Sequence, residues 1–302
     1  MAFSHENPAL ASAHKPVTRR NFLRLSLLAS ICPPILLFQG DITPKERIGD
    51  NLIHKYLGEQ LDYQIGFWLL SHCGEARVRL CKSPTRPIFI ACMTGKTAGF
   101  VDWLVGRCRY SYTSYSSYDE EGDRLSPLYF RLRKKRKNKV GIRTVTFNYK
   151  QKEVIYARRT PEGQETHKVV PMEGNILYED YLTLFYNFRN GYYGCLQRDK
   201  TYHLPLYIHE GFNYLDLTIG SEREAANARA QELRPKNMDY FVRFRVLKED
   251  VSSKSGKIVG WLSKDAVPVK GVIKDVILFG DLWGVLVKRQ FTQKSCREDE
   301  LL

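Results

Sequence analysis

Residues 61–67 read LDYQIGF, and this stretch predicts the fold class. Four apolar residues at odd positions alternate with Asp62, Gln64 and Gly66. A period of two is expected of a strand that buries one face and exposes the other. Similar alternating or short apolar runs occur at 76–81, 87–93, 109–118, 128–133, 142–149, 154–156, 240–247, 257–262, 269–275 and 282–287. We therefore expect a mostly β protein built as a long antiparallel meander.

Helical spacing occurs in two places within this pattern of strands. Residues 178–189 carry aromatic and aliphatic side chains three and four positions apart, and Asn190-Gly191 provides a stop. Residues 221–233 are rich in Ala, Glu and Arg and begin with Ser221 and Glu224, the spacing of a capping box. Residues 97–105 suit either a short helix or a strand. The sequence thus predicts one central helix and a small helical insertion.

The N-terminus carries a different signal. Residues 18–24 read TRRNFLR and precede an apolar run to Phe38, which resembles a twin-arginine export signal. The run contains Pro33-Pro34 and falls short of the roughly 20 apolar residues that a membrane span needs. We expect export to the periplasm or to the periplasmic face of the envelope, where an uncleaved signal would act as an anchor. The domain boundaries that follow are a signal segment at 1–40, a lead-in at 41–57, one β domain at 58–290 and a polar tail at 291–302.

The charge balance favours anionic partners. The chain has 47 basic and 33 acidic residues, a formal charge of +14, which suits phospholipid headgroups, lipopolysaccharide or nucleic acid. Export makes nucleic acid the least suitable of these. Eight cations without an acid fall on a predicted hairpin tip: Arg131, Arg133, Lys134, Lys135, Arg136, Lys137, Lys139 and Arg143. They form either a contact for an anionic membrane surface or a solvated loop.

Motifs for catalysis and cofactors are missing from the sequence. It has no Gly-x-Ser-x-Gly, glycine-rich phosphate loop or Cys-x-x-Cys, and its histidines are scattered. Glu173, Glu179 and Asp180 lie near a helix start, where they serve either as acid–base groups or, more commonly, as caps. We expect most of the six cysteines after the signal to be buried thiols, although sequence leaves their pairing open. A non-enzymatic protein without metal or cofactor is expected.

A family resemblance appears in the C-terminal half. Leu184–Arg189 (LFYNFR), residues 261–265 (WLSKD), Val267-Pro268-Val269 and residues 279–284 (FGDLWG) resemble the bacterial exported family called domain of unknown function 3108. That family is similar to the lipoprotein-carrier (LolA/LolB-like) superfamily. The resemblance implies a strongly curved antiparallel sheet, a half-barrel, whose hollow is plugged by a helix and can hold acyl chains. The family positions are Trp261, Asp265, Pro268 and Gly280, for which burial and turn formation give a structural account.

Together these patterns predict a binding protein. We expect a cell-envelope protein that holds a lipid, an acyl chain or a lipid-linked glycan in the hollow of the sheet. The helix face that would line the hollow comprises Leu182, Phe185, Tyr186 and Arg189. The alternative is a structural or scaffold module that binds another envelope protein through sheet edges or the basic hairpin.

Overall fold

The structure is a computed structural model that describes residues 52–67, 70–174, 176–209, 213–230, 237–276 and 280–295. The predicted export signal, most of the lead-in and the end of the tail lie outside the described residues. All of these described residues belong to one compact unit, Gly49–Leu302.

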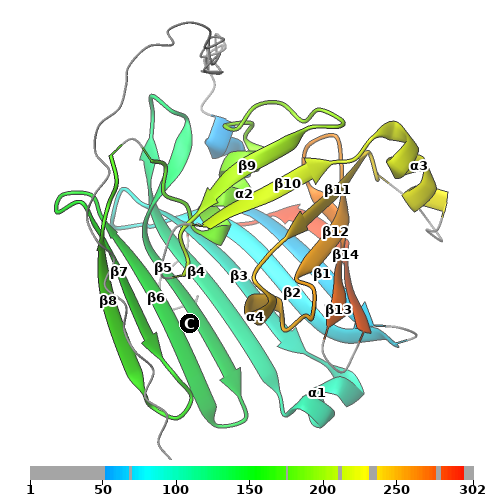
Figure 1. Cartoon of the computed structure of the whole chain (residues 1–302), viewed down its shortest axis with the longest axis horizontal. Helices are drawn as coiled ribbons and strands as arrows, with labels where there is room; N and C mark the ends of the chain where they lie inside the picture. Colours follow the sequence, from blue (N-terminus) through cyan, green and yellow to red (C-terminus); the bar gives the residue numbers. More distant parts are fainter. Residues whose placement is uncertain are drawn as a thin grey trace, which may run out of the picture. The chain divides into compact units, whose positions relative to one another are not determined.

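A single antiparallel sheet of 14 strands dominates this unit. The strands are β1 (Glu59–Phe67), β2 (Leu70–Lys82), β3 (Phe89–Thr97), β4 (Cys108–Asp119), β5 (Arg124–Arg136), β6 (Lys139–Asn148), β7 (Glu153–Arg159), β8 (Glu165–Pro171), β9 (Thr201–Leu206), β10 (Asn213–Ile219), β11 (Tyr240–Arg245), β12 (Lys257–Leu262), β13 (Pro268–Val276) and β14 (Gly280–Phe291). Each strand pairs with its neighbours in sequence, except that β1 pairs with β14 and that β8 and β9 are the two edges. The prediction of a mostly β, antiparallel fold that is not closed into a barrel is confirmed (Figure 1).

Short helices accompany the sheet. They are the 3-10 helix η1 (Leu52–Tyr56) and the α-helices α1 (Gly99–Val105), α2 (Tyr181–Arg189), α3 (Glu222–Ala230) and α4 (Lys248–Val251). The two predicted helices are α2 and α3, and the ambiguous stretch 97–105 becomes α1 after Thr97 ends β3. The sequence patterns do not predict η1 or α4, because elements of four or five residues are too short to show a helical period.

Local chemistry explains where α2 and α3 begin. The Asp180 carboxylate accepts hydrogen bonds from the backbone N–H groups of Leu182 and Thr183, at 2.7 and 3.0 Å, and the Thr183 hydroxyl accepts the Asp180 N–H in return. At α3 the predicted capping box is present, since Ser221 and Glu224 each accept the other's backbone N–H. Such caps satisfy donors that have no partner within the helix.

The core lies inside the curve of the sheet, around α2 (Figure 1). One apolar cluster joins Phe130 and Val145 of β5 and β6 to Leu204, Leu215 and Val242 of β9 to β11. The strands near the two free edges therefore pack together through the interior without pairing. A second cluster packs η1, β1 and β2 against the other flank of α2. The helix thus plugs the incomplete barrel.

Most of the cysteines that the structure describes are buried, as expected. Cys73, Cys92 and Cys108 are buried thiols, and Cys195 is exposed. Cys81 is 1% exposed and is disulfide-bonded. The sequence alone does not identify Cys81 as a cysteine that forms a disulfide.

Candidate functional site

The helix face predicted to line a ligand groove is largely buried. Leu182 and Tyr186 are 3% and 0% exposed and belong to the core cluster beside η1 and β1. Arg189 is also buried, and Phe185 is half-buried against the same cluster. The three cavities described below are lined by other residues. The geometry thus makes this face a packing surface and directs the search for a site elsewhere.

Arg189 has a specific structural role. Its two terminal nitrogens donate to the two carboxylate oxygens of Glu59 at 2.6 and 2.9 Å, in the interior. Glu59 also accepts from Arg289 Nε at 2.9 Å, and the Tyr56 hydroxyl donates to the Arg189 carbonyl at 2.9 Å. A buried bidentate pair needs such additional hydrogen bonds to offset desolvation. This pair fixes the end of α2 to β1.

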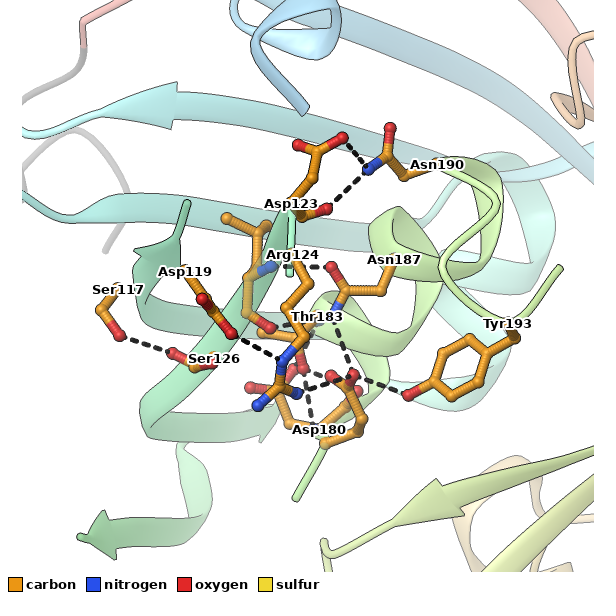
Figure 2. A network of polar contacts seen from close by, with 12 residues as sticks. Ser117, Asp119, Asp123, Arg124, Ser126, Asp180, Thr183, Asn187, Asn190 and Tyr193 are labelled. Atoms are coloured by element: carbon orange, nitrogen blue, oxygen red, sulfur yellow. Dashed lines mark hydrogen bonds and ion pairs between the residues drawn. The ribbon is translucent and has the colours of Figure 1, made fainter. Parts of the chain in front are cut away.

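Asn187 fixes the helix to β5 in a second way. Its side-chain oxygen accepts the Leu125 N–H at 2.8 Å and its Nδ2 donates to the Leu125 carbonyl at 2.8 Å and to Glu179 Oε1 at 2.7 Å. At the end of the same helix, Asn190 Nδ2 donates to the backbone carbonyl and to the side-chain carboxylate of Asp123. Figure 2 shows these contacts between α2 and the start of β5. The amide of Asn187 thereby satisfies backbone groups as a paired strand would.

The carboxyl groups at the start of α2 are fully buried. Burial raises the pKa of Glu179 to about 7, although hydrogen bonds from Thr183, Tyr193 and Asn187 lower it. Burial likewise raises the pKa of Asp180 to about 6 against its hydrogen bonds with Ser114 and the helix N-terminus. The expectation that acids here cap a helix is confirmed for Asp180.

On the other side of α2, the neighbouring strands β10 and β11 separate over part of their length. β10 pairs with β11 only through Thr218 and Ile219, whereas its first residues pair with β9 alone. A cavity of about 440 Å³ lies in this separation, and we name it the lateral cavity. Its lining is Tyr181, Leu206, Ile208, His209, Tyr214, Leu215, Asp216, Arg245, Val246 and Leu247. Most of these side chains are apolar or aromatic, and the polar ones lie among them.

A cluster of four polar side chains adjoins the lateral cavity, and we name it the Asp250 cluster. The Asp250 carboxylate of α4 accepts from the Tyr181 hydroxyl at 2.6 Å and lies 2.8 Å from His209 Nε2 and 3.3 Å from Arg143 Nη1. Burial alone would raise the pKa of Asp250, but hydrogen bonds with His209 and Tyr181 hold it below its usual value. The cluster joins β6, α2, the end of β9 and α4 across the interior.

A second, smaller cavity lies on the far side of this cluster. Its volume is about 250 Å³, and we name it the basic cavity. Arg143, Arg158 and His209 line it together with Tyr156, Ala157, Thr166 and Ile208. No carboxylate is among these lining residues, and Ile208 and His209 line both cavities. An apolar space and a cationic space therefore share a wall.

A third hollow carries charges of both signs. It has a volume of about 610 Å³ and is lined mainly by residues of β1 to β5. Arg77 pairs with Asp62 at 2.6 Å and Lys96 pairs with Glu75 at 2.9 Å within it. Because these exposed cations already have acids beside them, the hollow offers a weaker basis for selective binding than the two cavities around Asp250.

The basic run lies on the β5–β6 hairpin, as predicted, but its members separate. Lys134, Lys135, Arg136, Lys137 and Lys139 are exposed around the turn, whereas Arg131, Arg133 and Arg143 are half-buried. Arg143 is directed to Asp250 and is not part of the exposed tip. A run read along the sequence cannot make this distinction, because alternate strand residues point to opposite faces.

The family positions have structural roles. Trp261 is 2% exposed and packs against Phe241, with ring centroids 5.2 Å apart. Asp265 lies exposed in the turn between β12 and β13, 3.6 Å from Arg289. Pro268 begins β13 and its carbonyl accepts from the Tyr63 hydroxyl, and Gly280 begins β14 with a φ of 73°. The Pro268 contact joins β13 to β1, and that of Trp261 joins β12 to β11.

The candidate site combines residues that sequence reasoning did not connect. Tyr181, His209 and Asp250 are far apart in the sequence, and Arg143 was grouped with the hairpin. Of these residues, Tyr181 lies in the stretch 178–189 that the sequence predicts as helical, and no sequence pattern relates it to His209 or Asp250. Among the described residues, no group of three or more His, Cys, Asp or Glu is placed to hold a metal ion. Within the same residues, no helix combines the length and the apolar character of a membrane-spanning segment.

Comparison with known proteins gives the family and a fold neighbour. No curated protein matches the chain. Among solved structures, the chain is similar to the beta-barrel-like protein of domain of unknown function 1849 from Brucella abortus, with 12% identity and a TM-score of 0.44 over 78% of this chain and 98% of that chain. The profile of the protein family of unknown function DUF3108 matches residues 62–282. Since this match spans most of the chain, the protein belongs to the DUF3108 family.

Proposed function

We propose that this protein is a non-enzymatic binding protein for an amphiphile, such as a lipid or an acyl chain, and that the chain of the amphiphile lies in the lateral cavity. The observation that supports this function is the separation of β10 from β11 beside a plug helix. It gives a largely apolar space beside a break in the strand pairing. A volume of about 440 Å³ lies within the range of pockets that enclose small organic ligands.

The lining suits an alkyl chain. Leu206, Leu215 and Ile208 are buried, while Val246 and Leu247 are at the rim where β11 ends. Each methylene group that moves from water into such a space contributes about 0.8 kcal/mol. A chain of moderate length therefore gains enough to overcome the cost of association.

A cavity-filling substitution tests this function. Leu247 is 39% exposed, so Leu247→Trp adds a ring at the rim without forcing it into the core. We expect wild type to bind a 12-carbon alcohol in native mass spectrometry and the variant to lose at least tenfold in affinity. Val287→Trp is the matched control, because Val287 is an exposed aliphatic residue on β14, away from this cavity. If wild type and Leu247→Trp bind the alcohol equally well, its alkyl chain does not lie in the lateral cavity.

The exposed hairpin supports a second part of the proposal, contact with an anionic membrane surface in the cell envelope. Lys134, Lys135 and neighbouring cations surround the turn, each worth about 1 kcal/mol close to such a surface. We expect Lys134→Glu with Lys135→Glu to reduce binding to phosphatidylglycerol vesicles by about 30-fold or more at low salt. Lys150→Glu with Lys152→Glu, at the opposite end of β6, changes the same charge on exposed residues and should have little effect. Salt should abolish the difference, because it screens exposed charges.

A scaffold function is the second candidate, and the edge strand β8 supports it. Six of its seven residues, Glu165–Pro171, are exposed, and one side of the strand lacks a neighbour in the sheet. Such an edge can accept an added strand from a partner. Protein purified without any bound amphiphile, and unable to bind the alcohol probe, would favour this function.

A further inference from the structure

Three side chains from three elements converge on one carboxylate in the Asp250 cluster. The Tyr181 hydroxyl and the Arg143 guanidinium donate to it, and His209 Nε2 lies 2.8 Å from it and 3.2 Å from Arg143 Nη1. Tyr181 begins α2, Arg143 lies in β6, and His209 follows β9. The Asp250 side chain is 6% exposed, whereas those of Arg143 and His209 are about one-fifth exposed. These distances, 2.6 to 3.3 Å, describe a slot for an oxyanion that the protein fills with its own side chain.

The acceptor and the donors are held differently. Two donors lie on a paired strand and on the helix fixed by Asn187 and Arg189. Asp250 lies on α4, a four-residue helix in the connection from β11 to β12. Two backbone bonds of that connection are local, from Asp250 N–H to the Leu247 carbonyl and from Ser253 N–H to the Lys248 carbonyl, whereas the contacts with β13 begin only after Asp250, at Ser253 and Lys254. The donors therefore form a preorganised site, and the carboxylate belongs to a short surface connection.

The surrounding cavities indicate what else the slot accepts. Without the Asp250 carboxylate, Arg143 would face Arg158 and His209 around the basic cavity. On the other side, the lateral cavity offers apolar walls to an alkyl chain. His209 and Ile208 belong to both linings. A ligand with an anionic group at the end of an apolar chain fits this arrangement: its chain would lie in the lateral cavity and its anionic group beside the basic cavity.

We propose that the slot formed by Arg143, Tyr181 and His209 binds the anionic group of an amphiphile, a carboxylate or phosphate, and that Asp250 occupies this slot when no ligand is bound. The inference rests on the proposed function, because the chain of the same ligand lies in the lateral cavity. Binding then exchanges one anion for another on the same donors. The ligand competes with Asp250, which lowers affinity and makes release easier.

A purely structural clamp makes the opposite prediction. If Asp250 only holds α4 in place, its loss distorts the cavity rim and weakens binding of every ligand. If Asp250 competes with the ligand, its neutralisation strengthens binding of anions alone. The sign of the effect on anionic probes therefore separates the two roles.

The experiment uses three probes with the same 12-carbon chain: dodecanoate, dodecyl phosphate and 1-dodecanol, each below its aggregation limit. Affinities are measured by native mass spectrometry and calorimetry at one pH and salt concentration. For Asp250→Asn we expect about tenfold tighter binding of at least one anionic probe and unchanged binding of the alcohol. Dodecanoate and dodecyl phosphate distinguish the two sources of anion.

Arg158→Gln provides a second variant that does not disturb the cluster itself, because Arg158 is exposed at the rim of the basic cavity. It should weaken the anionic probes several-fold and leave the alcohol unchanged. Circular dichroism establishes that each variant is folded. Should Asp250→Asn not fold, Arg158→Gln alone decides whether the basic cavity faces the anionic group.

The outcomes separate this inference from the proposed function. If the alcohol binds in the lateral cavity but Asp250→Asn leaves or weakens the anionic probes and Arg158→Gln has no effect, the anion slot is wrong and the binding function stands. If none of the three probes binds wild type or variants, both are wrong. Selective tightening of an anionic probe supports both.

Discussion

The two sides of α2 differ in how they hold the helix. Toward β1 and β5, buried groups fix it: the Glu59–Arg189 pair and the Asn187 contacts with Leu125. Figure 2 shows how closely the polar groups of α2 meet the start of β5 on this side. Toward β9 to β11, the helix packs through apolar side chains such as Leu184 and Phe188, and Tyr181 donates to Asp250 on a short connection beside the lateral cavity. We call these the fixed side and the exchange side.

This difference assigns the two sides different tasks. Moving α2 out of the hollow would break the buried ion pair of Arg189 and the hydrogen bonds of Asn187 with the backbone. The free-energy cost would be large, because each broken contact leaves a buried group unpaired. For the proposed ligand, we therefore expect access to the interior from the exchange side, where β10 and β11 are already apart. In this proposal α2 lies beneath the ligand, and the ligand enters between β10 and β11.

The largest effect is expected from breaking the ion pair of the fixed side. Arg189→Met leaves the fully buried Glu59 carboxylate with Arg289 as its remaining charged partner. Loss of one partner from a buried pair costs about 3–5 kcal/mol. We expect this decrease in the free energy of unfolding by urea denaturation.

The matched change on the exchange side is Arg143→Met. Arg143 lies 3.3 Å from Asp250 and is about one-fifth exposed, so water compensates part of the loss. We expect a cost of roughly 1 kcal/mol. Equal costs for the two arginines would contradict the division into a fixed and an exchange side.

The pH dependence of stability should give the next largest difference between the two sides. The pKa of Glu179 is raised to about 7, so the folded protein binds a proton that the unfolded chain lacks between about pH 4.5 and 7. Stability from this group is therefore complete below pH 4.5 and falls as pH rises through 7, by on the order of 3 kcal/mol. Asp180, with its pKa raised to about 6, acts in the same direction. Thermal unfolding at pH 5 and 8 should show the fall, and Glu179→Gln should reduce it.

Asp250 has the opposite sign. Its pKa is lowered from 3.8, so its contribution is present above that value and is lost only as the pH falls further. Asp250→Asn should therefore leave the change between pH 5 and 8 as it is in wild type. A variant that flattens that change as Glu179→Gln does would show that the exchange side also controls stability near neutrality.

The fold was largely predictable because its signals are local. Alternation in residues such as 61–67 identifies strands, and the Ser221–Glu224 spacing identifies the start of α3. The curvature and the plug came from the family resemblance, since a period of two does not encode how a sheet bends. α4 escaped prediction because four residues carry no period.

The site was less predictable because its contacts are distant in the sequence. Helical spacing places Arg189 on one face with Leu182, but nothing local reveals that Glu59 lies opposite, 130 residues earlier. Arg143 belongs to a run of cations, yet its partner Asp250 follows 107 residues later. Such pairs determine whether a charged helix or strand residue faces a ligand or completes the interior.

The smallest expected effect comes from removing one hydroxyl on each side. Tyr56 donates to the Arg189 carbonyl on the fixed side, and Tyr181 donates to Asp250 on the exchange side. Tyr56→Phe should lower the free energy of unfolding by about 1 kcal/mol, the typical value of a hydrogen bond between neutral groups. Tyr181→Phe should change it less, because the connection that carries Asp250 can open before the sheet unfolds.

Hydrogen exchange locates that difference. The backbone N–H groups of Asp250 and Ser253 are bonded within their own connection, to Leu247 and Lys248. Tyr181→Phe should speed their exchange by about tenfold, which corresponds to about 1.4 kcal/mol of local stability. Tyr56→Phe should leave these two amides unchanged relative to global unfolding. If Tyr181→Phe leaves the exchange rates of these two amides unchanged, the rest of the chain holds Asp250 in place, and the exchange side is as fixed as the other.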